Sequence, residues 1–503
     1  MSGRVEQTDV LISGLGPVGA VLAIYLARLG IGVIAVERDT QVYPLPRAAH
    51  LDHETMRLLH LAGGADAVLA ASQPLSTYEF RAADGALLMG FAPGRGIAPT
   101  GFPPSSMFHQ PTLEHALRAR LTALDLVSAR VGHTLVAYAA HEDGVRAQIE
   151  GPDGPYEVEA KFLVGCDGGA SLVRKHAGIE LEDMGFDEPW LVVDARLKNG
   201  LRNLSTVGLQ LCDPARPVTS MPMAPGRHRW EFMMRPGETA EDVSSDARID
   251  ELVAPFVDPA HVEIERRAVY RFHAVRAREW RKGRVVLAGD AAHQMPPFMG
   301  QGLCSGVRDA ANLGWKLAAI LQGRAVPVLL DSYQVERAPH VQSITEIAVF
   351  MGQLVCTQDD ARAAARDRDM TAKPEADRFS AMPGLAGLAS GIVAGHASAG
   401  AVFPEPWLGE GASRRRLDED AGLAPLLVTR GPVAASLTSR FAAGGGFAIE
   451  AGALADAEGD LEALMAGAGA ILVRPDRHVF GCGEAAGLLD AWDAYLASGT
   501  AAA

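Results

Sequence analysis

A glycine-rich turn near the N-terminus constrains the fold of this chain more than any other feature. The turn follows an apolar run at 9–13 (DVLIS) and precedes a segment, 18–29, in which apolar residues recur at helical spacing. A second apolar run covers 31–36 and is followed by Glu37. This order predicts a strand, a helix and a second buried strand. The turn consists of Gly14, Leu15, Gly16, Pro17, Val18 and Gly19.

The composition of the turn predicts what it binds. Turn amides and the N-terminus of a helix attract a pyrophosphate, so the turn residues are candidate cofactor ligands. Pro17 fits the first helical turn, where its missing N–H costs no hydrogen bond. Glu37 ends the second strand, where its carboxylate can accept hydrogen bonds from an adenosine ribose and would repel a 2′-phosphate. The turn therefore predicts FAD or NAD rather than NADP.

Two further glycine–acid motifs occur later in the chain. The first is FLVGCDGGAS at 162–171, and the second is LAGDAAH at 287–293, followed by the segment PPFMGQG at 296–302. Together with the N-terminal turn, these motifs resemble the three fingerprints of the single-component (class A) flavoprotein aromatic hydroxylases. The resemblance covers nearly the whole chain. The segments CDPARPVTS, RWEFM and PPFMGQGLCSGVRDAANLGWKL look most similar to the 3-(3-hydroxyphenyl)propionate hydroxylases.

The resemblance implies an α/β fold with three units. It places a Rossmann-type, glutathione-reductase-like FAD-binding domain at 1–185 and 275–400, with an inserted β-sheet substrate domain at 186–274. A Pro/Gly/Ala-rich region at 383–413 is typical of a linker and precedes a thioredoxin-like C-terminal domain at 415–503. This last unit lacks a Cys-x-x-Cys pair, so a packing or dimer-stabilising role is expected there rather than thiol–disulfide chemistry.

The resemblance also implies how FAD is held. Asp290 would hydrogen-bond the ribityl chain, with Gly289 before it for close backbone approach. Backbone amides at the start of the following helix would face the isoalloxazine, where the helix dipole favours the anionic reduced flavin. The residues of this helix start are Gly300, Gly302, Leu303 and Cys304.

Four other residues match positions near the cofactor in this family. Asp167 belongs to a motif that serves both FAD and the reductant, although capping of the following helix explains it equally well. For the others, a surface arginine or a helix-start glutamine is the alternative. They are Arg38, Arg47 and Gln110, near the phosphate or ribityl portion.

The chemistry implied by the resemblance needs no nucleophilic side chain. NADH or NADPH reduces FAD, O₂ is trapped as the flavin C4a-hydroperoxide, and the distal oxygen is transferred to a ring carbon ortho or para to a phenol oxygen. The protein orients the substrate, excludes water and assists phenol deprotonation. Because the chain has no second dinucleotide fingerprint, the reductant is expected to bind only transiently.

The substrate side is less strongly marked in the sequence. Pro297 and Pro296 would lie beside the flavin and limit the position of oxygen transfer, and His293 could assist proton transfer or make a structural hydrogen bond. The alternating central stretch at about 190–275 predicts a sheet over the pocket. Its apolar residues are candidate substrate contacts, with ordinary core packing as the alternative. They are Met221, Met223, Trp230, Phe232 and Met234.

Charge and cysteine usage narrow the partners. The net charge of −15 disfavours nucleic acid and anionic membranes, and no apolar run is long enough for a transmembrane helix. The polar N-terminus and five separated cysteines favour the cytoplasm and indicate neither a disulfide framework nor a metal site. The expected partners are a small aromatic substrate and O₂, in a homo-oligomer, most simply a dimer.

Three alternatives differ in testable ways. A hydroxylase of a larger polycyclic, polyketide or antibiotic substrate would share all three fingerprints and differ in pocket volume. A FAD-dependent dehydrogenase or oxidase would not need the motif around Asp167. A flavin-binding protein without catalysis would be expected to have lost a fingerprint, and none is damaged. The favoured hypothesis is a FAD-dependent monooxygenase acting on a phenolic ring, such as a 3-(3-hydroxyphenyl)propionate-like acid.

Overall fold

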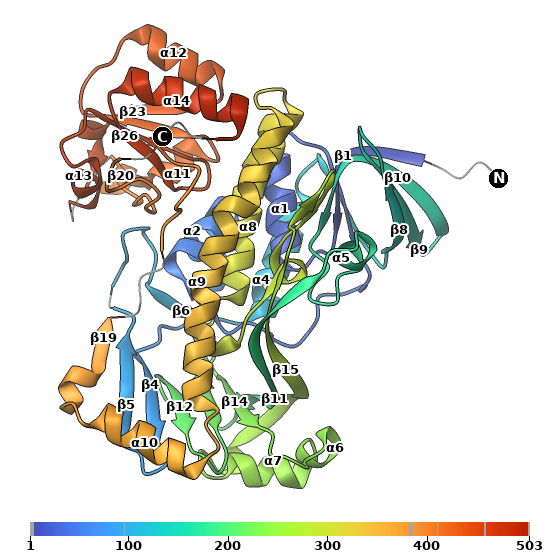
Figure 1. The fold of residues 1–503 in the computed structure, drawn as a ribbon, viewed down its shortest axis with the longest axis vertical. Helices are drawn as coiled ribbons and strands as arrows, with labels where there is room; N and C mark the ends of the chain where they lie inside the picture. The colour runs from blue at the N-terminus through green and yellow to red at the C-terminus, as the bar shows by residue number, and fades with distance from the viewer. Residues whose placement is uncertain are drawn as a thin grey trace.

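The computed structural model describes residues 5–94, 96–381, 386–393, 395–409, 411–456 and 459–500. They form two large sheets and a C-terminal unit with its own sheet, with a long helix running past all three (Figure 1). None of the helices in this part of the chain combines the length and the hydropathy needed to cross a membrane. Positions 383–385, 394 and 410 of the expected linker lie outside the described residues.

The predicted βαβ unit lies at the centre of the first sheet. β1 (Val5–Ser13) pairs in parallel with β2 (Val33–Glu37) and β10 (Gly154–Gly165), and α1 (Pro17–Arg28) connects β1 to β2. β17 (Val285–Leu287) and β7 (Val127–Val131) continue the parallel order. The three glycine motifs follow β1, β10 and β17, so they meet at one edge of the sheet. The antiparallel margins are β8 (Thr134–Ala140), β9 (Val145–Gly151) and β16 (Arg281–Lys282).

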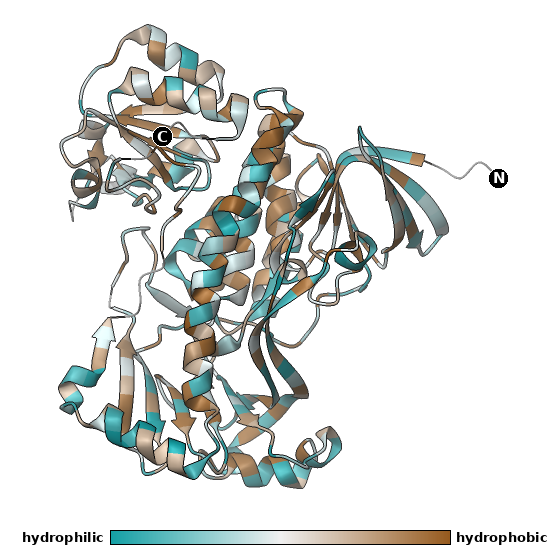
Figure 2. Ribbon diagram, in the orientation of Figure 1, coloured by the Kyte–Doolittle hydropathy of each residue, from teal (hydrophilic) through white to brown (hydrophobic). Residues whose placement is uncertain are grey.

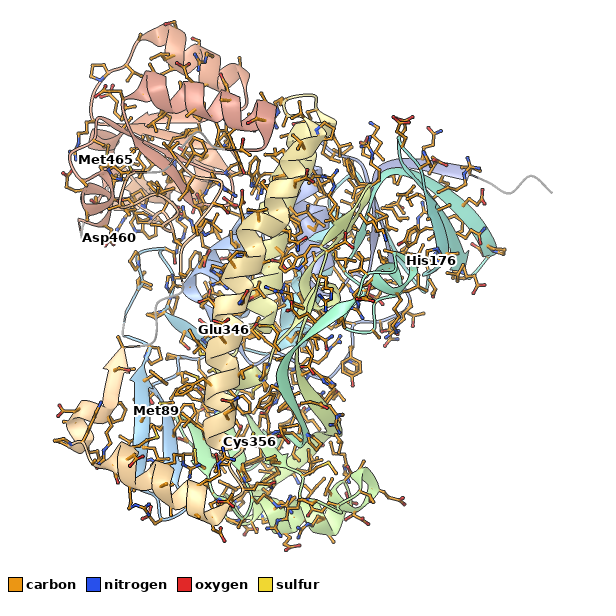
Figure 3. All side chains as sticks on the ribbon, in the orientation of Figure 1. Met89, His176, Glu346, Cys356, Asp460 and Met465 are labelled. Carbon is orange, nitrogen blue, oxygen red and sulfur yellow. The ribbon has the colours of Figure 1, made fainter. Side chains whose placement is uncertain are left out.

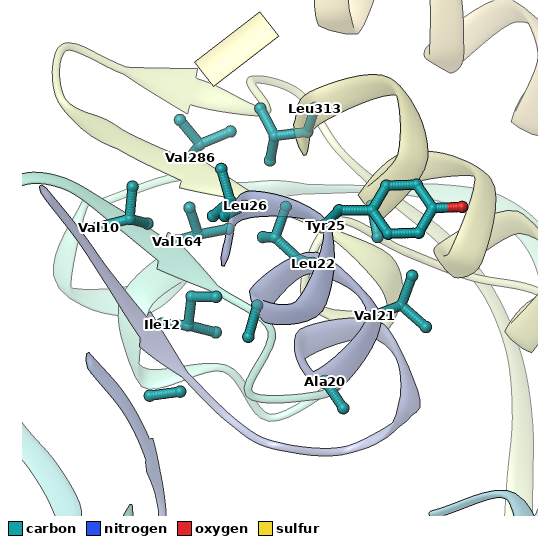
Figure 4. Packing of buried hydrophobic residues seen from close by; sticks show 14 of the residues in the cluster. Val10, Ile12, Ala20, Val21, Leu22, Tyr25, Leu26, Val164, Val286 and Leu313 are labelled. Carbon is teal, nitrogen blue, oxygen red and sulfur yellow. The ribbon is translucent and has the colours of Figure 1, made fainter. Parts of the chain in front are cut away.

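Burial on both faces explains the continuous apolar run of β1. Val10 and Ile12 are fully buried and pack against Leu22 and Leu26 of α1 (Figure 4). Leu313 covers the same core from α8 (Gly302–Leu321). Parallel strands that are covered by helices on both sides need such side chains. The core of the first unit therefore lies directly behind the glycine turn.

The second sheet has the strand order β18-β15-β11-β14-β13-β12-β4-β5-β19. Its central strands are β11 (Leu181–Leu197), β12 (Val207–Cys212), β13 (Val218–Pro222), β14 (Arg227–Met233) and β15 (Val262–Ala277). The others are β4 (Thr77–Ala82), β5 (Leu87–Ala92), β18 (His293–Gln294) and β19 (Phe379–Ala381). Four of its strands thus come from outside the expected insert at 186–274: β4 and β5 from earlier in the chain, and β18 and β19 from later in it.

Two long helices connect the units. α8 begins beside the third glycine motif, and α9 (Asp331–Val355) runs from the C-terminal unit to the second sheet, with hydrophobic and hydrophilic residues alternating along it (Figure 2). Figure 3 places Glu346 midway along α9 and Cys356 just beyond its end. Met351 and Ala348 join the core under the second sheet. Shorter helices are α2 (His53–Leu61), α4 (Gln110–Thr122), α5 (Leu172–His176), α7 (Asp246–Val253) and α10 (Asp360–Thr371).

The C-terminal unit contains a four-stranded sheet in the order β23-β22-β25-β26. β22 and β23 are parallel, whereas β25 runs antiparallel to both β22 and β26. Apolar segments of the tail form these strands. Their bounds are β22 (Leu426–Thr429), β23 (Phe447–Glu450), β25 (Ala470–Val473) and β26 (Val479–Gly483), with α11 (Leu417–Ala421), α12 (Ala435–Ala443), α13 (Asp460–Met465) and α14 (Ala485–Ser498) beside them.

Candidate active site

A cavity of about 580 Å³ joins the edge of the first sheet to one face of the second. At one end it is lined by the N-terminal turn and Glu37, and at the other by residues of β12, β13 and β14. The turn before α5 and the turn before α8 line it in between. All three glycine motifs therefore border one continuous space.

The N-terminal turn leaves room for a ligand at one position only. Gly14 has φ +98°, and a Cβ there would lie 2.4 Å from the carbonyl oxygen of Cys166. A Cβ on Gly19 would lie 2.0 Å from the carbonyl oxygen of Gly14, so this glycine lets α1 pack against the turn. A Cβ on Gly16 would meet no protein atom within 4 Å. Gly16, with Pro17 and Val18, borders the cavity at the N-terminus of α1, where negative charge is favoured.

Glu37 braces this turn as well as lining the cavity. Its Oε2 accepts a hydrogen bond from the Leu15 N–H at 2.9 Å, and its Oε1 accepts one from the Asp39 N–H at 3.1 Å. Each carboxylate oxygen has a further lone pair. The neighbouring Arg38 also lines the cavity, with an exposed side chain 3.9 Å from Asp39.

Asp290 sits inside the protein, but its side chain is exposed to the cavity that it lines. Burial raises the pKa of Asp290, and the charges of His293 and Arg47 offset this only in part. Within the described residues the carboxyl has no hydrogen-bond partner. A carboxyl that is open to the cavity and has no protein partner can accept hydrogen bonds from a ligand, so this position suits a ligand with hydroxyl donors.

The start of α8 supplies free backbone donors beside Asp290. The first helical hydrogen bond runs from the Ser305 N–H to the Gln301 carbonyl oxygen at 2.9 Å, so the amides before Ser305 lack helical partners. Gly302 and Leu303 line the cavity at this point, as does Gly300, which has φ +63°. The Cys304 side chain is buried outside the lining, and its thiol points to the carbonyl oxygens of His50 and Gly300 at 3.8 Å.

The residues around Arg47 and Asp167 line the cavity, but their polar groups are largely engaged. The Gln110 Oε1 accepts the N–H groups of Arg47 and Ala48, and its Nε2 donates to Glu114 at 2.7 Å. Asp167 accepts hydrogen bonds from Ser171 at 2.5 Å and from the Val173 N–H at 3.1 Å, which caps α5. Gln110 and Asp167 therefore shape the cavity wall chiefly by holding backbone segments in place.

His293 does not reach the cavity. Its imidazole is buried, and its Nε2 lies 2.6 Å from a carboxylate oxygen of Asp309 on α8. Asp309 also accepts hydrogen bonds from Arg337 on α9 and from the Gly289 N–H. The structure thus corrects the expectation of a catalytic His293, because its imidazole joins a buried ionic network. Pro296 is likewise buried outside the lining, whereas Pro297 borders the cavity.

The expected apolar substrate wall needs a similar correction. Trp230 and Phe232 are almost completely buried on the opposite face of the second sheet, where they pack against Ile249 and Leu252 of α7. Met223 is buried outside the cavity lining, and Met221 alone of the five apolar substrate candidates lines it. The alternation of β14 was predicted, but α7 covers its aromatic face, which leaves the polar face toward the cavity.

The cavity face of the second sheet carries polar groups among apolar ones. Glu231, Thr219 and Gln210 come from β14, β13 and β12. Arg229 lies two residues before Glu231, and its guanidinium binds both carboxylate oxygens of Asp194, at 2.7 and 3.0 Å. Apolar lining residues at this end include Leu75, Met107, Met221, Phe272, Phe298 and Met299.

The comparison of sequences now decides the family. Residues 7–348 match the family described as FAD binding domain. A probable NADH-specific resorcinol 4-hydroxylase of Rhodococcus jostii is 38% identical to this chain, over 95% of this chain and 92% of that protein. The chain belongs to the FAD-dependent aromatic hydroxylases.

Further relatives and solved structures are also similar to this hydroxylase. A 3-(3-hydroxy-phenyl)propionate/3-hydroxycinnamic acid hydroxylase of Mycolicibacterium smegmatis is 39% identical, over 72% of this chain and 63% of its own length. Among solved structures, the OxyS anhydrotetracycline hydroxylase from Streptomyces rimosus superimposes with a TM-score of 0.78 at 27% identity, covering 99% of this chain and 100% of its own. Aklavinone-11 hydroxylase with FAD and aklavinone gives 0.79 at 27% identity, covering 98% and 99%.

The site fits the FAD of this hydroxylase family. The space beside Gly16, the unpartnered carboxyl of Asp290 and the free amides at Gly302 match a pyrophosphate, a ribityl chain and an electron-rich ring in turn. Sequence motifs had indicated each of these three positions. The cavity residues that the motifs missed are Tyr78, Gln210, Thr219, Arg229 and Glu231. They are spread over four strands of the second sheet, and only the polar face of β14 was visible as a local pattern.

Proposed function

We propose that this hydroxylase inserts one oxygen atom of O₂ into a small phenolic ring, ortho or para to a phenol oxygen, with NADH as the preferred reductant and NADPH as the alternative. The named activities of the relatives support a small phenol. Bound FAD would take the hydride from the nicotinamide and supply activated oxygen to the substrate. The protein would hold both molecules and keep water out.

One observation carries this proposal. The cavity runs without a break from Asp290 and Gly302 past Pro297 to the face of the second sheet. A substrate against that face would lie opposite the ring of a flavin held by α8. Asp290 would accept a hydrogen bond from a ribityl hydroxyl, and the first-turn amides of α8 would stabilise negative charge on the reduced flavin.

The size of the cavity favours a single aromatic ring over a polycycle. About 580 Å³ falls within the range of a site for one drug-sized ligand, and here the whole of FAD, from the pyrophosphate to the ring, shares it with the substrate. The polyketide hydroxylases share the fold at 27% identity, whereas the relatives named for small phenols reach 38 to 40%. A large polycyclic substrate is therefore the less favoured alternative, and a dehydrogenase or oxidase less so again.

The finer architecture belongs to the same proposal. We infer a glutathione-reductase-like FAD-binding domain at 1–185 and 275–400, a substrate domain around 186–274, and a thioredoxin-like domain at 415–503. The strand order and directions of the C-terminal sheet support the last assignment. The five cysteines in the chain are free, so a role in packing is favoured. A cytoplasmic homodimer remains a prediction.

Turnover of the holoenzyme tests the proposed function. NADH oxidation by FAD-loaded protein should accelerate on addition of resorcinol or 3-(3-hydroxyphenyl)propionate. The product should carry one additional ring hydroxyl, and its amount should match the NADH consumed. If NADH is oxidised with only H₂O₂ formed for every phenol tried, the protein is an oxidase and the proposal fails.

A further inference from the structure

Glu231 is an unusual residue for a cavity that receives an aromatic ring. It lies in the middle of the second sheet on β14, is 5% exposed, and lines the cavity. In the register of the sheet it stands between Thr219 on β13 and Val192 on β11. A carboxyl buried in such a place must have a compensating role or partner. The side chains around Glu231 therefore indicate its role.

A row of polar side chains connects Glu231 to the loop beside the flavin site. Thr219 donates to the Gln210 Oε1 at 2.8 Å, and the Gln210 Nε2 donates to the Tyr78 hydroxyl at 2.7 Å. The Tyr78 hydroxyl donates to the Phe298 carbonyl oxygen at 2.9 Å. Phe298 directly follows Pro297. The row therefore fixes the sheet to the loop that would face the flavin.

The Phe298 carbonyl oxygen, at the end of the row, determines the direction of every hydrogen bond in it. A backbone carbonyl only accepts, so Tyr78 must donate to Phe298 and accept from Gln210. The Gln210 carbonyl oxygen then faces Thr219, whose single proton it takes. Thr219 stands directly opposite Glu231 in the register of the sheet, and with its proton given to Gln210 it has only lone pairs left for the Glu231 carboxyl. A hydrogen bond formed between them would therefore use a proton carried by Glu231.

A protonated Glu231 presents an acceptor to the cavity. With its proton directed at Thr219, its carbonyl oxygen can accept a hydrogen bond from a ligand. The environment agrees, because burial raises the pKa of Glu231 despite the nearby Arg229. Arg229 lies 3.9 Å away, beyond hydrogen-bond distance.

The cations at this end of the cavity are already paired. Arg229 is held by Asp194, and Arg271 pairs with Asp187 at 2.6 Å. His273 also contacts Asp187, at 3.0 Å. Among the described lining residues, the other arginines are Arg38, Arg47 and Arg118. The Arg47 carbonyl oxygen accepts from Arg229 at 2.7 Å, and the Arg47 guanidinium lies over the Tyr43 ring. A substrate carboxylate beside Glu231 would therefore find Arg229, Arg271 and His273 already paired.

We propose that Glu231 selects the substrate by accepting a hydrogen bond from a ring hydroxyl of an uncharged phenol, with the row Thr219–Gln210–Tyr78 holding its carboxyl in orientation. This inference rests on the proposed function and narrows its substrate class. A diphenol such as resorcinol has one hydroxyl to bind here and another to direct the hydroxylation. Glu231 is thus a specificity-determining residue.

Ligand binding to the holoenzyme tests this role without turnover. Resorcinol and 3-(3-hydroxyphenyl)propionate are titrated into FAD-loaded protein without NADH, and Kd is measured from the perturbed flavin absorbance. The variants are Glu231→Gln, Glu231→Leu and, as a matched control, Glu263→Leu on an exposed position of β15. FAD content and anaerobic reduction by NADH verify that each variant is folded.

We expect wild-type protein to bind resorcinol more tightly than the acid. Glu231→Leu should weaken resorcinol binding at least tenfold, because the hydroxyl loses its acceptor in a dry site. Glu231→Gln should stay within threefold, since its amide donates to Thr219 and still offers a carbonyl oxygen. Glu263→Leu should not change Kd.

Three results would overturn the inference: unchanged resorcinol binding in Glu231→Leu, an equally large loss in Glu231→Gln, or tighter wild-type binding of the acid. The first two would show that Glu231 is no acceptor or acts as a charged group. If the Kd pattern holds but no hydroxylated product forms with NADH and O₂, the proposed function fails while the binding role of Glu231 stands. If hydroxylated product forms but the Kd pattern is absent, the proposed function stands and the binding role of Glu231 fails.

Discussion

Gly14 and Gly16 are two residues apart but are required for different reasons. Gly14 needs its positive φ, and a side chain there would strike the Cys166 backbone. Gly16 has an extended backbone that any residue adopts, with φ −63° and ψ 179°, and a Cβ there would enter the cavity. Gly14 is therefore needed for the backbone of the turn to fold, and Gly16 leaves space for the ligand.

This difference predicts opposite results for two alanine variants. Gly16→Ala should leave the melting temperature of the apoprotein within about 2 °C, since it removes no contact and adds no strain. It should lower FAD affinity at least tenfold, because the methyl group occupies the pyrophosphate space. Gly14→Ala should instead lower the apoprotein melting temperature. Retention of full FAD affinity by Gly16→Ala would contradict the assignment of the turn.

Asp290 yields a second prediction at this scale. Asp290→Ala should weaken FAD binding by about tenfold or more, because a charged acceptor contributes roughly 1.5–3 kcal/mol per hydrogen bond. Glu346→Ala, which removes an exposed carboxylate midway along α9, is the control and should keep wild-type affinity. FAD titration followed by tryptophan fluorescence measures both. Equal affinity in the two variants would place the ribityl chain elsewhere.

Sequence motifs indicated the candidate cofactor residues because these positions require a specific residue type. A turn that must admit a phosphate needs glycine, and this need is visible locally. The substrate face was harder to predict, because Tyr78 lies on a strand far along the chain from Gln210 and Thr219, and the three meet only through sheet pairing. Trp230 illustrates the limit: alternation showed two faces of β14, but only the position of α7 decides which one is covered.

At the scale of elements, Asp309 ties three of them together. Its carboxylate accepts from His293, from Arg337 on α9 and from the amide of Gly289 before Asp290. All of these groups are buried. The network fixes α8 and α9 relative to the third glycine motif, which the local pattern of the motif did not reveal.

Loss of the Asp309 carboxylate should strongly destabilise the folded protein. Asp309→Ala leaves Arg337 buried and unpaired, so we expect it to lower the free energy of unfolding by about 3–5 kcal/mol. Asp331→Ala removes an exposed partner of Arg281 at the start of α9 and should cost about 0–1 kcal/mol. Urea denaturation of both variants provides the comparison. Similar small losses would mean that the network does not organise the turn.

At the scale of the whole molecule, buried ion pairs attach the C-terminal unit to the rest. Arg57 on α2 binds Asp418 and Glu405, and Arg474 binds Glu336 on α9. The C-terminal unit is therefore bound both to α2, from the early part of the chain, and to α9, from a much later part. A thioredoxin-like unit was expected here from the resemblance, but its docking was not, because ion pairs between distant segments leave no local pattern.

Glu405 makes this attachment sensitive to pH. Burial raises the pKa of Glu405, and the neighbouring Asp418 adds to the shift, which the attraction of Arg57 opposes. Since the folded-state pKa is above the unfolded one, the stabilisation is complete at acid pH and is lost as pH rises through the folded-state value. Between about pH 6 and 9, the melting temperature of wild-type protein should fall more steeply than that of Glu405→Gln. Parallel curves would contradict this.

The central claim is that one cavity brings reduced FAD, O₂ and a phenol together, so that the ring receives an oxygen atom from O₂. Turnover of resorcinol with NADH under ¹⁸O₂ in ordinary water measures this directly by mass spectrometry of the product. The account predicts one ¹⁸O atom in each newly hydroxylated ring. A hydroxylated product without ¹⁸O, or complete oxidation of NADH with no product, would contradict it.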